Sequence, residues 1–284
     1  MCNTAWRVCR RQLKSALGQP RVWLAGLIGI GVAVWRATRV VGLSSLAGQP
    51  LQLSEPAFAC LADRLILTLL FMAFLLLSAE VPYGSAGDLF ILMRVGRNRW
   101  IAGKILYIFC LCLLYTAVIC AAAALTAVTV SFPGNVWSYP FYQLMENGIG
   151  NNLLSLSAAD PELLHRLTPW AALLCAAGLW VLYLFFNGLL LCLCNLGKSR
   201  VWGFALTGGL HALVFCDGTQ KFSHLLPLAH VSPTELWIQS FWGTSRCCGV
   251  GESFLYFAAL CTVLIVAVAV RTDKVDLSHA IPES

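Results

Sequence analysis

The polar residues whose types and spacing could do chemistry gather in one stretch between two long apolar runs, from Glu80 to Lys104. An acid begins this stretch, and its second half also carries Arg94, Arg97 and Arg99. It has none of the patterns of a catalytic nucleophile, a zinc site or a phosphate-binding loop. Its chemistry is therefore charge-based binding, either docking onto a partner or contact with lipid headgroups.

The same stretch predicts a short helix with both ends marked. Ser85, followed three residues later by Asp88, forms a capping box that satisfies backbone N–H groups of the first turn. Gly96 suits the left-handed position that ends a helix, and Asn98 suits the cap that begins the next one. We expect about ten residues of helix, roughly 15 Å long, on the inner side of a membrane between two spans.

Candidate polar residues inside the apolar runs are few. Asn187 and His211 are the candidates for a substrate path, although a lone histidine there is more often hydrogen-bonded to a neighbouring backbone. The sequence has no Walker-type loop, no Gly-x-Ser-x-Gly elbow and no His-Glu-x-x-His pair. We therefore expect no enzymatic activity in this chain. We expect no metal site either, since its two Cys-x-Cys pairs lack the companions of a zinc site.

Composition predicts an all-α integral membrane protein. Of 284 residues, 59% are hydrophobic and 11% charged, against about 25% charged in soluble domains. A bilayer core about 30 Å thick needs about 20 helical residues. Six runs approach that length, although the fifth is short: Val22–Val41, Leu65–Val81, Ile105–Val130, Trp170–Cys194, Val201–Cys216 and Phe254–Val270.

The distribution of charge predicts the orientation of these spans. With the N-terminus inside, inner segments hold 13 of the 19 basic residues and five acids, while outer segments hold six basic residues and eight acids. Because basic residues favour the cytoplasmic side, both termini are expected there. The net charge of +6 is then a topology signal, so we do not expect nucleic-acid binding.

The N-terminal residues predict a helix lying in the plane of the inner leaflet, and not a cleaved signal peptide. Apolar residues, among them Trp6, share one face, and Gly18 and Pro20 end the helix. A generic membrane anchor is the alternative. Its basic residues lie on other faces: Arg7, Arg10, Arg11 and Lys14.

The outer segments carry further expectations. Pro50 and Pro56 should break the first outer connection, and near the outer end of the first span the long side chains of Arg36 and Arg39 can reach outward. The apolar stretch 217–252 is expected to dip back into the outer leaflet before the last span. Pairing among the outer cysteines is left open: Cys60, Cys216, Cys247 and Cys248.

The inner stretch resembles the type-2 ATP-binding-cassette permeases, the six-span subunits of bacterial exporters. That family has an acid at the inner end of span two, then Gly-Ser or Gly-Thr, paired aliphatics, an Arg-rich turn and Gly-Lys at the start of span three. Where the family usually has a proline before the arginine, this chain has Gly96. The matching residues are Glu80, Gly84-Ser85, Leu92-Met93, Arg97 with Arg99, and Gly103-Lys104.

The resemblance implies a single permease domain over residues 1–284, with an interfacial helix (1–20), six spans (22–270) and a cytoplasmic tail (271–284). Ser85–Val95 would be the coupling helix that docks on a separate cytoplasmic ATPase, which binds the ATP and Mg. The coupling residues would be Glu80, Gly84, Ser85, Gly87, Asp88, Leu89, Phe90, Arg94, Arg97, Arg99 and Lys104.

The implied activity is export of a peptide, lipid or drug-like substrate across a bacterial plasma membrane by alternating access. A second permease chain, identical or a paralogue, would complete the complex. The rival interpretation is a non-transporting multi-pass protein, a scaffold or resistance factor, that binds partners or lipids through its basic inner helices.

Overall fold

The computed structural model describes residues 2–82, 87–147, 167–196, 200–216, 226–231 and 250–274. Over these residues the chain is an all-α multi-pass membrane protein with almost no strand. Four helices are long and apolar enough to cross a bilayer by themselves. They are α2 (Pro20–Ala47), α6 (Arg97–Ala127), α10 (Pro169–Asn195) and α13 (Val250–Lys274).

Two further apolar elements lie beside these four. The helices α3 (Glu55–Ala62) and α4 (Arg64–Ser78) form a pair bent by 83°, which together counts as a fifth candidate span. The helix α11 (Arg200–Cys216) has 17 residues, fewer than the roughly 20 of a full crossing. Each predicted apolar run therefore contains a helix, while a sixth complete crossing stays a prediction.

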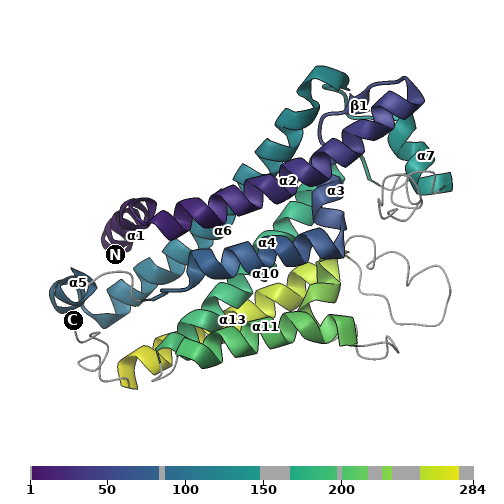
Figure 1. The fold of residues 1–284 in the computed structure, drawn as a ribbon. Coiled ribbons are helices and arrows are strands. Elements are labelled where there is room, and N and C mark those ends of the chain that lie inside the picture. Colours follow the sequence, from purple (N-terminus) through teal and green to yellow (C-terminus); the bar gives the residue numbers. More distant parts are fainter. Residues whose placement is uncertain are drawn as a thin grey trace.

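The helices run alongside one another and place different elements at the two ends of the molecule (Figure 1). At one end lie α1 (Cys2–Leu17), α5 (Gly87–Val95), the first turns of α2 and α6 and the last turn of α13. We call this the basic end. The opposite end, which we call the far end, carries two short strands and α7 (Tyr139–Asn147).

The central helix is α10. Two thirds of its apolar window (67%) is buried inside the protein, against 22% for α13 and 33% for α2. Its neighbours are α13, α11, α6 and α3. The large apolar side chains left exposed on the outer helices are those that a bilayer would cover.

The predicted breaks at Gly18–Pro20 and at Gly96 are confirmed, whereas α2 runs to Ala47, past its predicted end at Val41. The first helix ends at Leu17 and α2 begins at Pro20. Gly96 lies between α5 and α6 with φ +85°, and its N–H donates to the Leu92 carbonyl at 2.9 Å. The prediction for Asn98 was wrong, because α6 begins at Arg97 and Gly96 takes the cap position. The capping box at Ser85 and Asp88 lies outside the described side chains.

At the far end, a strand pair joins the chain segments that follow α2 and α6. The strands β1 (Leu51–Gln52) and β2 (Ser131–Phe132) are parallel. Glu55, buried at the start of α3, accepts hydrogen bonds from the Gln52 N–H at 3.0 Å and the Ser138 N–H at 2.6 Å. Pro56 does not break this connection, because it lies in the first turn of α3, where a helix tolerates proline.

The structure also describes Arg36 and Cys60. Arg36 does not reach outward: it is 4% exposed, and its Nη2 pairs with Asp63 Oδ2 at 2.9 Å. Cys60 is a free, buried thiol, whereas the side chains of the other three outer cysteines are not described.

Of the stretch 217–252, the structure describes residues 226–231 and 250–252, and within it η3 (Pro227–His230) packs on α11, α10 and α13. There the buried His230 ring stacks on Tyr256 at 4.2 Å, and its Nδ1 lies 3.1 Å from Ser253 Oγ. Whether the full segment enters the outer leaflet stays a prediction.

Candidate functional site

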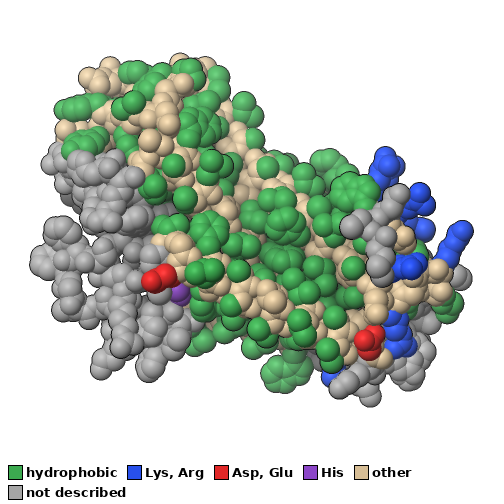
Figure 2. Space-filling view, turned by 180° about the vertical axis from the view of Figure 1, so that it is seen from behind, with side chains coloured by type: hydrophobic (Ala, Val, Ile, Leu, Met, Phe, Trp, Pro, Cys, Tyr) green, Lys and Arg blue, Asp and Glu red, His purple; other side chains and the backbone are tan. Residues whose placement is uncertain are grey.

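The basic end carries an exposed cationic surface formed by α1, α5, the first turn of α6 and the last turn of α13. Figure 2 shows Lys and Arg side chains gathered at this end, beyond a largely hydrophobic middle. Among the described side chains, the acidic ones at this end are Glu80 and Asp273. The exposed basic residues are Arg7, Arg10, Arg11, Lys14, Arg94, Arg97, Arg99 and Arg271.

The helix α5 lies at the extremity of this end (Figure 1). Its described side chains divide into two groups. Ile91, Leu92 and Val95 are half-buried and pack on the core. Met93 and Arg94 are exposed, Met93 to 83%. Thus α5 is anchored by one face and presents an apolar and a basic side chain on another.

Three predicted coupling residues lie together on this exposed surface: Arg94, Arg97 and Arg99. Arg97 has a structural partner as well, since its Nη1 donates to the Asp273 carbonyl at 2.8 Å. A cation suits the C-terminal end of a helix, so Arg97 ties the first turn of α6 to the last turn of α13.

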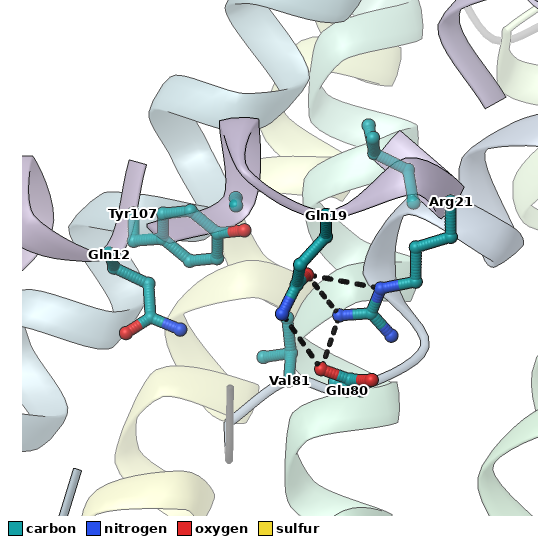
Figure 3. Close-up of a pocket in the computed structure, with 8 residues that line it drawn as sticks. Gln12, Gln19, Arg21, Glu80, Val81 and Tyr107 are labelled. Carbon is teal, nitrogen blue, oxygen red and sulfur yellow. Dashed lines mark hydrogen bonds and ion pairs between the residues drawn. The ribbon is translucent and has the colours of Figure 1, made fainter. Parts of the chain in front are cut away.

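Glu80 is directed to a different partner. Its carboxylate forms an ion pair with Arg21 and accepts a hydrogen bond from Gln19 Nε2 at 3.3 Å (Figure 3). Arg21 Nη2 also donates to Gln19 Oε1 at 2.7 Å. Glu80 therefore fastens the C-terminal end of α4 to the connection between α1 and α2.

The pocket in Figure 3 adjoins this cluster and is also lined by Gln12 and Tyr107. It encloses about 240 Å³ of empty space, open solvent included. The polar groups beside this space bond to one another and so join α4 to the connection between α1 and α2.

Lys104 is likewise separate from the exposed surface. Its side chain is 0% exposed, and its Nζ donates to Gln12 Oε1 at 2.7 Å and lies 5.3 Å from the centroid of the Trp100 ring. One residue earlier, a Cβ on Gly103 would lie 2.7 Å from Val8 of α1. Gly103 and Lys104 thus form the close contact between α6 and α1.

Four of the eleven predicted coupling residues have helical backbone but no described side chain: Gly87, Asp88, Leu89 and Phe90. Gly84 and Ser85 lie outside the described residues. Of the predicted interfacial set, Trp6, Arg7, Arg10, Arg11 and Lys14 are all exposed on α1.

Asn187 and His211 meet through Tyr183. Asn187 Nδ2 donates to the Tyr183 carbonyl at 2.9 Å, and His211 Nδ1 lies 2.7 Å from the Tyr183 hydroxyl. His211 Nε2 lies 3.0 Å from Thr68 Oγ1, and its ring stacks on Phe71 at 4.3 Å. Both predicted residues are buried. They join α10, α11 and α4, an arrangement that a helix contact accounts for without a substrate.

Sequence reasoning missed the glutamines that complete these contacts. Gln12 and Gln19 carry no charge and match no motif, so nothing in the sequence alone marks them. Comparison with known proteins finds no matching family model, no matching curated protein and no matching solved structure. In the described part of the chain, no group of three His, Cys, Asp or Glu residues could hold a metal ion.

Proposed function

We propose that this chain is the membrane-spanning subunit of an ATP-binding-cassette exporter, driven by a separate ATPase that docks at the basic end. The observation that carries the proposal is α5, a nine-residue helix between two apolar helices that exposes Met93 and Arg94 at the extremity of the molecule. A short helix anchored on one face and open on the other fits a groove of a partner protein.

Contacts behind α5 support the same proposal. An ATPase that moves α5 would move α6 directly, because Gly96 alone separates the two helices. The movement would reach α13 through Arg97 and α1 through Lys104. Force applied at one short helix would thereby act on several helices that traverse the protein.

The test is native mass spectrometry of the tagged protein purified from its own host. We expect two permease chains with two ATPase chains. Arg94→Glu or Met93→Asp should weaken ATPase retention roughly 30-fold, the effect of losing an interface anchor worth about 2 kcal/mol. The matched control is Arg271→Glu, a charge reversal of an exposed arginine at the same end but outside α5, which should retain the ATPase.

A complex without any nucleotide-binding chain would overturn the proposal and favour the non-transporting scaffold. Equal loss of the ATPase in the Arg94 and Arg271 variants would show that net charge at this end, and not α5, holds the partner.

A further inference from the structure

The helix α1 divides its surface into three faces. Val8, Cys9, Gln12 and Ala16 are buried against the rest of the protein, chiefly α6. At 100° per residue, the opposite surface separates into an apolar flank and a basic flank. The basic flank consists of Arg7, Arg10, Arg11 and Lys14, all exposed.

The apolar flank of α1 continues onto the outer face of α2. Trp6 and Leu17 are exposed on α1, while Trp23 and Leu24 are exposed near the start of α2. Trp23 Nε1 donates to the Leu17 carbonyl at 2.8 Å and joins the two surfaces. Because α2 is a candidate span, this shared apolar surface belongs in the bilayer, and its tryptophans suit the interface depth.

Because the apolar flank lies in the lipid, the neighbouring basic flank faces the lipid headgroups. With Trp6 and Leu17 at the lipid interface, the side chains of Arg10 and Lys14 lie at the level of the headgroups. No acid occurs in α1 to neutralise them. Amphipathic helices with basic residues beside apolar ones are drawn to anionic lipid in this way.

We propose that the basic flank of α1 binds the headgroups of anionic phospholipids in the leaflet at the basic end. This site is distinct from α5 and does not depend on the exporter assignment. The helix that carries the site is held to α6, because Gln12, on its buried face, accepts a hydrogen bond from Lys104.

The experiment titrates the purified full chain in detergent with phosphatidylglycerol and, separately, with phosphatidylcholine of the same acyl chains, and counts bound lipids by native mass spectrometry. Each basic residue near an anionic surface contributes about 1 kcal/mol, or roughly fivefold in affinity. We therefore expect Arg10→Gln/Lys14→Gln to bind phosphatidylglycerol about 25-fold more weakly and phosphatidylcholine unchanged.

Two control variants and one substitute variant make the result specific. Arg271→Gln neutralises an exposed arginine of α13 at the same end and should leave the affinity within about twofold of the native chain. Arg10→Lys keeps the charge and should bind normally. If the double variant does not elute as a folded species, the single Lys14→Gln variant, with an expected loss of about fivefold, decides the question.

Equal affinity for the two lipids, or an unchanged preference in the neutralised variant, would overturn the proposal. So would displacement of phosphatidylglycerol by soluble glycerol 3-phosphate at comparable concentration, because the ligand would then be a free phosphate group.

Discussion

At the residue scale, two buried charges meet where α2 passes the joint between α3 and α4. Arg36 and Asp63 pair at 2.9 Å with side chains only 5% and 12% exposed. Asp63 has a second role as the cap of α4, where its Oδ1 accepts from the Leu65 N–H at 2.9 Å. One carboxylate thus holds α2 in place and begins a membrane helix.

Two substitutions separate these roles. Asp63→Asn keeps an oxygen that can cap α4 but removes the charge, so the free energy of unfolding should fall by about 3–5 kcal/mol. Asp63→Ala also removes the cap and should cost about 1 kcal/mol more. Unfolding titrations in mixed micelles measure both. The control is Asp273→Asn at an exposed site, which should change the free energy of unfolding little. If Asp63→Asn were as stable as the native chain, the ion pair between Arg36 and Asp63 would contribute nothing to stability.

Both charged residues can be read from the sequence, but the ion pair between them could not be predicted from it. Arg36 in an apolar run predicts a side chain that reaches outward, because a span read alone offers no partner. Its carboxylate lies 27 residues along the chain and becomes a neighbour only when α2 packs against the bent pair. The hydrogen bond between Gln12 and Lys104 could not be predicted either, because these residues are 92 positions apart in the sequence and become neighbours only when α1 packs on α6.

At the element scale, the attachment of α1 depends on a small residue in α6. A Cβ on Gly103 would lie 2.7 Å from two Val8 carbons and 3.0 Å from the Ala5 carbonyl oxygen. Gly103→Leu should therefore displace α1 and lower the free energy of unfolding by about 1–3 kcal/mol. Limited trypsin digestion should then cut α1 at Arg10 and Arg11 faster than in the native chain.

The control for this substitution is Gly31→Leu on α2, where an added Cβ meets nothing within 4 Å. It should digest at the native rate. Native digestion of Gly103→Leu would show that α6 accommodates the larger side chain, and that the approach of the two helices is not needed to hold α1.

Elements were largely predictable because long apolar runs and their breakers are local signals. Gly18 and Pro20 separate α1 from α2, and Gly96 separates α5 from α6. The bend of 83° between α3 and α4 was not predictable. An aspartate such as Asp63 indicates that a helix begins after it, but it does not indicate the angle to the helix before it. Nor was the two-residue strand pair predictable, because it is too short to show a period and forms between segments 80 residues apart.

At the scale of the whole molecule, charge is segregated along the long axis. The exposed arginines and lysines of α1, α5 and the ends of α6 and α13 occupy one end, while the middle is hydrophobic (Figure 2). This segregation follows from composition and position along the chain, so the sequence could predict it. The identity of a docked partner depends on surfaces outside this chain, and a motif of about 25 residues predicts only its class.

The proposed function requires the basic end to face the cytosol, because ATP is available there. Met93→Cys places a thiol on α5, where the native side chain is 83% exposed, and Val136→Cys places one at the far end, where the native side chain is 71% exposed. A membrane-impermeant thiol reagent applied to intact cells should label Val136→Cys and leave Met93→Cys unlabelled until the cells are permeabilised. The native chain supplies the blank for its own cysteines. Labelling of Met93→Cys from outside would reverse the orientation, and an ATPase could then no longer reach α5.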